Sequence, residues 1–538
     1  MANFFKKKHV PESPASGSSA TGIPSLQNVW IVRFGWLIPV CVVLAVYHVG
    51  INNYFTSDDF MWLERAHTFK NNWLQIFRPE GTYFDPLVHF LFVTDSLVAG
   101  LDPRWYHCVD LAIHAANSLL VYRVARLLCD DERAALYGSI IFAGSFAIAD
   151  AVLWSSSRVD LLATFFSLGS LIQFLYYLRS NKSRNLLLSF LLFVLALGAK
   201  GTPIILPALL LVLIVLEKKP LYFSLHLIPF GVVAIMYLAL LKVTAHLAAF
   251  RVDKVHFNIH NLAVAISAHF LPEETLTHLN LAVTATLLFI AVSAVGLATF
   301  PFRSTIVLRR TGYFFLLVAT LPVLVLDDFT LATGLSNFID LMGSPSHRIY
   351  LASVGIALLG GGFLRSVEEL LRKFFPKCAL IAVVMFLAGV VACDAFLVQE
   401  RDQLWEAEGE KARAVVDFLN SYRNQAVEGS QIGLIGFPVS RVYMEPMIKR
   451  RLGINEATFN YYVDIGILVD AKILQKAEKS FLFIFGRDGR IYNESQLYRQ
   501  QLLLSRRAIS NINNPEYISA AQTVTFDLTR RINQILGM

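Results

Sequence analysis

The stretch Asn53-Tyr54-Phe55-Thr56-Ser57-Asp58-Asp59-Phe60 follows the first long apolar segment, and the rest of the chain is organised around it. Its two adjacent carboxylates, Asp58 and Asp59, stand where a membrane-spanning helix is expected to emerge into water. A carboxylate held at the edge of a bilayer is costly to desolvate and is a functional-site hypothesis by default. The alternative is a solvated loop that is acidic because aspartate is common in turns.

The composition predicts a polytopic helical membrane protein. Of its 538 residues, 55% are apolar and 16% are charged, whereas about 25% are charged in soluble proteins. Its apolar segments have about the length needed to cross a bilayer core of about 30 Å. Lys and Arg in cytoplasmic loops account for the net charge of +7, so no nucleic-acid partner is expected. The five cysteines lie in or beside apolar segments without a CxxC pair, which favours packing over a disulfide or zinc site.

The N-terminal part sets the expected topology. Residues 1–28 are polar and rich in Pro, Ser and Gly, which predicts a disordered tail. The lysines in this tail favour a cytoplasmic N-terminus, so Asp58 and Asp59 are expected on the outer face, in a first outer loop over 52–106. Within this loop we expect a short amphipathic helix near residue 60. Residues 86–99 are apolar but short for a span, and placing them at the interface keeps the arginines near 123–133 cytoplasmic.

The predicted fold class is an all-α polytopic membrane domain over 29–398 with a small C-terminal α/β domain over 399–538 on the outer face. The pattern changes after residue 399, where a helix over 399–423 and short β-type runs at 432–437 and 480–485 are expected. About eleven spans are expected, at 30–51, 107–127, 134–151, 158–178, 185–199, 202–216, 221–242, 279–300, 311–330, 347–365 and 376–397.

Cations and carboxylates gather at the predicted outer ends of these spans. They are Arg158, Lys200 and Arg348, and Asp58, Asp59 and Asp160. Arginine forks suit phosphate oxygens, fixed cations stabilise developing negative charge, and a carboxylate serves as a general base. This set is what is needed to hold a lipid phosphate leaving group and to deprotonate an incoming hydroxyl. Alternatively, Arg158 and Lys200 are interfacial anchors that keep their charges in water.

Eight short motifs occur along the chain in the order SDDF (57–60), FDPL (84–87), GLDP (100–103), YH (106–107), HAAN (114–117), WSSSRVDLLA (154–163), ALGAKGTP (196–203) and HRIYL (347–351). In this order they resemble the motifs of the GT-C membrane glycosyltransferases. The similarity is to the branch with protein O-mannosyltransferases, transmembrane-and-tetratricopeptide mannosyltransferases and bacterial aminoarabinose transferases. It covers about residues 30–400 and lies in the order of the motifs rather than in any one of them. One departure is the C-terminal part, which does not form tetratricopeptide repeats and suggests a bacterial relative.

The resemblance implies roles for individual residues. By the match, Asp58 is the catalytic base, and Asp59 is its acidic neighbour or a metal contact. The donor is a polyprenyl-phosphate-linked sugar whose phosphate is held by Arg158 and Lys200. Asp160, as a possible second acidic residue, and Arg348 match further site positions.

A divalent metal ion stays an open expectation. His256 and His260 are spaced i,i+4, so on a helix they would share a face and could bind a metal. Asp59 is the other candidate for a metal contact. Solvated or interfacial histidines are the alternative, and we expect no other cofactor.

The function expected from the sequence is transfer of a sugar from a polyprenyl-phosphate donor to a hydroxyl acceptor. The acceptor is a protein, a lipid or a glycan, and the enzyme is expected in the bacterial inner membrane as a multi-pass protein. One alternative is a transporter or flippase, which predicts charges buried mid-span and broken helices in repeat halves. Another is a non-catalytic membrane scaffold, which would tolerate loss of Asp58 or Arg158.

Overall fold

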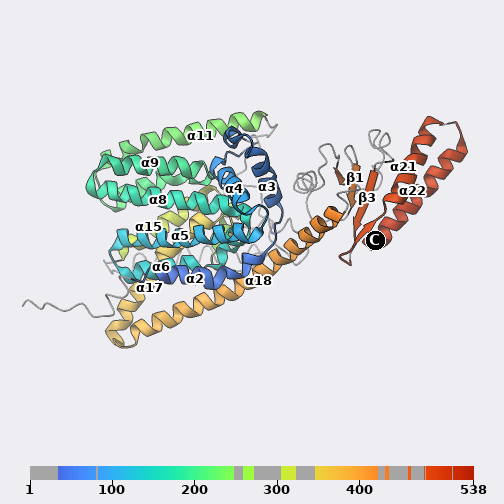
Figure 1. Cartoon of the computed structure of the whole chain (residues 1–538). Helices are drawn as coiled ribbons and strands as arrows, with labels where there is room; N and C mark the ends of the chain where they lie inside the picture. The colour runs from blue at the N-terminus through green and yellow to red at the C-terminus, as the bar shows by residue number, and fades with distance from the viewer. Residues whose placement is uncertain are drawn as a thin grey trace, which may run out of the picture.

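The computed structural model of the chain describes residues 34–79, 83–247, 259–271, 305–322, 346–421, 431–435, 459–461, 478, 480–486, 488–511 and 513–537. Most of the described residues are helical, in a bundle from which one long helix leads to a small sheet and two further helices (Figure 1). The bundle contains α2 (Leu37–Tyr47), α5 (Pro103–Cys129), α6 (Glu132–Gly144), α7 (Ala149–Leu153), α8 (Arg158–Ser180), α9 (Ser183–Leu197), α10 (Leu206–Leu216), α11 (Ile228–Leu247), α12 (Ile259–Ser267), α15 (Ile306–Thr320) and α17 (Tyr350–Phe374).

The described helices identify a multi-pass membrane protein. Four are long and apolar enough to cross a bilayer, at Ser155–Ser180, Leu221–Thr244, Tyr350–Phe374 and Ala379–Phe418. A fifth span arises if α6 and the segment Phe146–Leu153, which are bent by 50° relative to each other, are counted as one. The prediction of about eleven spans is larger because it includes helices of 10–17 residues, such as α9, that are shorter than a full crossing. The predicted span at 279–300 lies outside the described residues, so the full number stays a prediction.

The segment 52–106, predicted as the first outer loop, contains two short helices at the positions expected from the sequence. They are α3 (Asp58–Phe69) and α4 (Pro86–Ala99). With 14 residues, α4 is about 21 Å long, which is less than the hydrocarbon core of about 30 Å. The two helices pack on each other through aromatic rings, with Trp62 stacked on Phe92 at 5.5 Å. These rings belong to a buried apolar cluster that also includes residues of α8, α18 and the C-terminal sheet, and this cluster holds α3 and α4 in place.

Glycines allow three helices of the bundle to approach each other closely. A Cβ atom on Gly355 of α17 would lie 2.5 Å from the backbone nitrogen of Leu316 in α15. A Cβ atom on Gly361 of α17 would lie 2.5 Å from the carbonyl oxygen of Ala134 in α6. Without a hydrophobic driving force inside a bilayer, helices associate through such close backbone contacts between small residues.

The helix α18 (Ala379–Ser421) connects the bundle to the C-terminal part of the chain. Its 43 residues include both the predicted span 376–397 and most of the predicted helix 399–423. The domain boundary predicted at residue 399 therefore falls inside one continuous helix. In Figure 1, α18 runs along the bundle and continues toward the strands β1 and β3.

The C-terminal part is a four-stranded sheet with two helices. The strands are β1 (Gln431–Ile435), β2 (Phe459–Tyr461), β3 (Ser480–Phe485) and β4 (Ile491–Asn493), in the order β2-β1-β3-β4. β1 is parallel to β2 and β3, and β3 is antiparallel to β4. The helices α21 (Ser495–Ser510) and α22 (Pro515–Leu536) follow. Strands were predicted at the positions of β1 and β3, whereas β2 and β4 were not.

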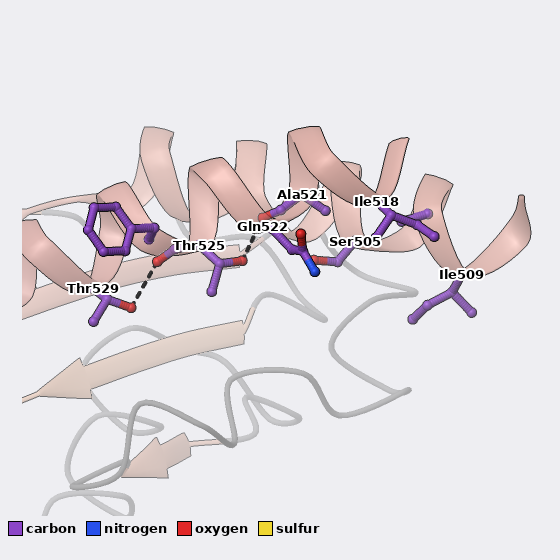
Figure 2. Close-up of a pocket in the computed structure, with 9 residues that line it drawn as sticks. Ser505, Ile509, Ile518, Ala521, Gln522, Thr525 and Thr529 are labelled. Carbon is purple, nitrogen blue, oxygen red and sulfur yellow. Dashed lines mark hydrogen bonds between the residues drawn. The ribbon is translucent and has the colours of Figure 1, made fainter. Parts of the chain in front are cut away.

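A groove of about 530 Å³ lies between α21 and α22 (Figure 2). Its lining includes Ile509, Ile518 and Phe526, and it contains none of the residues predicted for the site. The hydroxyls of Thr525 and Thr529 in the groove donate to backbone carbonyls one turn earlier in α22. Because these hydroxyls are already satisfied, the surface of the groove is mainly apolar.

Candidate active site

The turn from Ser155 to Asp160 is the centre of the candidate site. It consists of a 3-10 turn (Ser155–Ser157) and the start of α8, and its side chains are buried except for that of Val159, which is half-buried. Ser156 donates a hydrogen bond to Asp59 of α3. Arg158 reaches α4 and α5, and Asp160 accepts from Lys200 in the turn after α9. One short segment therefore contacts four others that are distant in sequence.

The acidic pair lies in the first turn of α3. Ser57, the residue before the pair, has φ 51°, a conformation that is rare outside glycine and that clusters at functional sites. Asp59 is buried and accepts from the Thr56 backbone N–H at 2.9 Å as well as from Ser156. Burial raises the pKa of Asp59 to about 7, against the lowering effect of these two hydrogen bonds. Asp58 is half-buried, so of the two carboxylates it is the more accessible to a substrate.

Three segments of the chain bring two cations and one carboxylate close together: Lys200, Arg348 and Asp160. The Lys200 ammonium donates to both carboxylate oxygens of Asp160 at 2.6 Å. Arg348, in the turn before α17, interacts electrostatically with the same carboxylate. Lys200 and Arg348 are both half-buried, so part of each side chain is exposed at the protein surface.

His347, next to Arg348, is buried beside the same two cations. Burial is the main cause that keeps the pKa of His347 well below its ordinary value, and the charges of Lys200 and Arg348 add to it. The imidazole is therefore neutral near pH 7, and the positive charge here belongs to Lys200 and Arg348.

Arg158 occupies a different environment from the one predicted. Its guanidinium is fully buried and pairs with Asp110 at 3.0 Å and with Asp95. A third nitrogen donates to the Tyr106 carbonyl at 3.1 Å, and the ring of Phe92 lies 4.4 Å from the guanidinium carbon. The predicted direct contact between Arg158 and a phosphate stays a prediction. The guanidinium is neutralised internally and holds α4, α5 and α8 together.

No metal site is evident among the residues that the structure describes. Within them, no group of three or more His, Cys, Asp or Glu side chains is placed to hold an ion. Both carboxylate oxygens of Asp59 accept from protein donors. His256 lies outside the described residues, and only the backbone of His260, in α12, is described. The expectation of a metal at these histidines is therefore untested.

The two carboxylates that pair with Arg158 are not among the site residues expected from the sequence. Asp95 lies within the apolar segment 86–99 and Asp110 within the predicted span 107–127. A charged residue inside such a segment is rare and usually has a specific partner, so this signal was available. What the sequence did not reveal was that both carboxylates share one arginine.

The arrangement offers the parts of an acid–base and charge-stabilising site. A half-buried carboxylate, Asp58, is next to the buried Asp59, which accepts a hydrogen bond from the turn. The same turn leads to Lys200 and Arg348, two cations around one carboxylate. A hydroxyl near Asp58 could lose its proton, and a phosphate near the cations could gain charge.

Solved membrane-protein structures resemble the chain, whereas no family model and no curated protein sequence matches it. ArnT from Cupriavidus metallidurans, solved bound to undecaprenyl phosphate, is 13% identical with a TM-score of 0.49, covering 85% of this chain and 94% of that one. The Archaeoglobus fulgidus oligosaccharyltransferase, solved with a tethered acceptor peptide, is 13% identical with a TM-score of 0.43, covering 87% and 74%. Both are GT-C membrane glycosyltransferases. Likenesses of this size do not say which reaction this chain performs, so the function is argued from its own residues.

Proposed function

We propose that this chain is a membrane glycosyltransferase that moves a sugar from a polyprenyl-phosphate donor to a hydroxyl acceptor. The observation that carries the proposal is the convergence of four motifs that resemble the GT-C pattern. The segments 57–60, 154–163, 196–203 and 347–351 are far apart in sequence, and their polar residues meet around the turn from Ser155 to Asp160. Motifs that are distant in the sequence therefore contribute their polar residues to one site.

The reaction would proceed by direct displacement. Asp58 accepts the proton of the acceptor hydroxyl as its oxygen forms a bond with the anomeric carbon of the sugar. The bond between that carbon and the phosphate oxygen breaks at the same time, and its electron pair leaves with the lipid phosphate. Lys200 and Arg348 stabilise the negative charge that develops on the departing phosphate, which is where fixed cations accelerate a reaction most.

The remaining charged residues are assigned supporting roles. Asp59 holds the start of α3 against the turn through its bonds to Thr56 and Ser156. Arg158 holds the base of the same turn through Asp95 and Asp110. Asp160 keeps Lys200 in place until a phosphate arrives and then shares it.

The localisation follows from the charge distribution of the sequence. The lysines near the N-terminus favour a cytoplasmic tail, which puts Asp58 and the C-terminal sheet on the outer face of a bacterial inner membrane. The donor and the membrane lipids would then be reached from within the bilayer. The acceptor, whether protein, lipid or glycan, would come from the outer side.

The first experiment compares Asp58→Asn with wild type, both reconstituted in lipid with labelled polyprenyl-phosphate sugars and an acceptor extract. Loss of a general base lowers the rate by about 100-fold or more, so release of lipid phosphate should fall by that amount. Asp102→Asn is the matched control, because Asp102 is an exposed helix N-cap in the same loop and asparagine caps equally well. Equal transfer by wild type and Asp58→Asn would remove Asp58 as the base.

One observation also suits a transporter. The bend of 50° between α6 and the segment Phe146–Leu153 is a broken helix, a feature that transporters use at their binding sites. The same reconstitution separates the two functions. Movement of a labelled lipid across the bilayer without any release of lipid phosphate, for every donor tried, would favour transport.

A further inference from the structure

Asp150 connects α18 to the segment that precedes the candidate site. This aspartate of α7 is fully buried. Arg401 of α18 donates to its two carboxylate oxygens at 2.7 and 2.8 Å, as a fork. The indole nitrogen of Trp405, one turn further along α18, donates to the same carboxylate at 2.8 Å. Three charge-assisted or polar hydrogen bonds on one carboxylate define its position closely.

Asp150 also reaches the turn that contains Arg348. The backbone N–H of Asp150 donates to the hydroxyl of Ser346 at 3.1 Å. That hydroxyl belongs to the turn from Ser346 to Ile349, which leads directly into α17. The aspartate therefore contacts α18 with its side chain and the turn before α17 with its backbone.

A column of aromatic rings makes the same connection a second time. Trp405 stacks on Trp154 with ring centroids 5.4 Å apart and an angle of 18° between the rings. Trp154, immediately before the turn at Ser155, meets His347 edge to face at 5.6 Å. The column thus begins on α18, passes the start of the turn from Ser155 to Asp160 and ends next to Arg348.

We propose that Asp150, Arg401 and Trp405 form a positioning clamp that holds Arg348 in place beside Lys200 and Asp160 for the donor phosphate. The three residues act through Ser346, Trp154 and His347, and none of them needs to touch a substrate. This inference rests on the proposed function, because it assigns Arg348 to the phosphate. It extends that function by making the outer half of α18 part of the catalytic framework.

The geometry explains why a clamp is needed here. Arg348 is half-buried and stands in a turn rather than within a helix or strand. A catalytic group must be held within a fraction of an ångström of its productive position, and groups in turns need support from neighbouring residues. The clamp supplies such support from a helix that is anchored along the bundle.

The test uses the full-length protein in lipid with three variants on α18. Trp405→Phe keeps the aromatic ring and removes one hydrogen bond to Asp150, and Arg401→Lys keeps the charge and removes the fork. Lys411→Gln is the control, because Lys411 pairs only locally with Glu408 on the same helix in the described contacts. The readouts are the Kd for undecaprenyl phosphate, the KM and kcat with the sugar donor, and amide hydrogen exchange over residues 346–350.

The clamp predicts a specific pattern in these readouts. Trp405→Phe loses one hydrogen bond to a charged group. In this variant the rate of amide exchange over residues 346–350 and the Kd for undecaprenyl phosphate should each rise by about tenfold. The donor KM should rise with them, and kcat should fall as well, because Arg348 also stabilises the charge that develops on the departing phosphate. General misfolding would instead lower kcat at constant KM. Arg401→Lys should show the same pattern, and Lys411→Gln should match wild type.

Two results separate this inference from the proposed function. If wild type releases no lipid phosphate with any donor, the proposed function fails, and exchange over 346–350 still decides whether the clamp exists. If wild type is active while Trp405→Phe and Arg401→Lys match Lys411→Gln in exchange and in Kd, the clamp is overturned and the proposed function stands.

Discussion

Two neighbouring carboxylates in one helical turn occupy different environments. Asp58 is half-buried, whereas Asp59 is buried and bonded to Thr56 and Ser156. Pairs of carboxyl groups whose surroundings differ in this way usually have different roles. The contrast supports assigning proton transfer to Asp58 and support of the turn to Asp59.

The raised pKa of Asp59 predicts a pH-dependent contribution to stability. Folded protein keeps this proton up to about pH 7, whereas the unfolded chain loses it near the ordinary value of 3.8. The folded state therefore binds more protons between these values, and this contribution to stability is lost as the pH rises through that window. Asp59→Asn cannot lose a proton, so its melting temperature relative to wild type should rise between pH 4 and pH 8. Thermal unfolding in detergent across this range measures the difference, and a constant difference would contradict the burial of the carboxyl.

Arg158 should behave as an internal ion-pair partner. Arg158→Gln leaves Asp95 and Asp110 buried without their cation, which typically costs about 3–5 kcal/mol of stability. Adding Asp110→Asn removes one of the uncompensated charges and should recover part of that loss. Unfolding in detergent tests both variants. If Arg158→Gln weakened donor binding at unchanged stability, Arg158 would be a direct phosphate contact, as the sequence resemblance implied.

At the scale of elements, the bundle depends on close backbone contacts of α17 with α15 and α6. Glycines in α17 face the backbones of both neighbours, so there is no room for side chains at these points. Such contacts are short in range, and a single added methyl group must push two helices apart. The position of α17 matters for the site because the turn that contains Arg348 leads directly into it.

Gly355→Ala should therefore destabilise the protein. The added Cβ would lie 2.5 Å from the Leu316 nitrogen and 2.7 Å from the Gly312 carbonyl oxygen, and such overpacking costs about 1–3 kcal/mol. Gly389→Ala is the matched control, because no atom of the described residues lies within 4 Å of a Cβ at this position in α18. Melting temperatures in detergent compare the two. A loss of equal size in both variants would contradict the packing argument, because alanine has a higher helix propensity than glycine and should not by itself destabilise either helix.

Local patterns predicted some elements well and others poorly. The short helices α3 and α4 follow from the amphipathic stretch after Asp58 and from the length of the apolar segment 86–99, both of which are local signals. The continuity of α18 was missed because its composition changes near residue 399, although helix geometry does not depend on that change. At the site, the roles of Asp58 and Lys200 remain predictions from motifs. The pairing of Arg158 with Asp95 and of Asp150 with Arg401 depends on tertiary contacts that no local pattern contains.

At the scale of the whole molecule, the number of membrane crossings and the side of the membrane on which each terminus lies are inferred from different features of the chain. Helix length and composition identify a multi-pass protein. The orientation rests on the distribution of lysine and arginine along the sequence. The proposed site needs the acidic pair of α3 and the C-terminal sheet on the outer face, opposite to the N-terminus.

Labelling of single cysteines in sealed right-side-out vesicles tests this orientation. In a background without the five native cysteines, Ile509→Cys should react with an impermeant maleimide from outside, since Ile509 is 60% exposed. Ser16→Cys, in the predicted cytoplasmic tail, should react only after the vesicles are opened. Reaction of both positions under the same condition would place the two ends on one side and would reverse or change the predicted topology.

The length of α18 has a mechanical consequence. At 43 residues, the helix is about 65 Å long, roughly twice the thickness of the hydrocarbon core. Phe418, near its far end, contacts Phe483 of the sheet, and Arg401 binds Asp150 of α7 partway along. The length of α18 between these two contacts therefore sets the distance between α7 and the sheet. Removing seven residues between these two points would shorten the helix by about 10 Å and turn it by only about 20°. The sheet would then be pulled along the helix axis in nearly the same orientation, and Phe481 and Phe483 would leave the buried cluster that they share with Phe55 and Phe60.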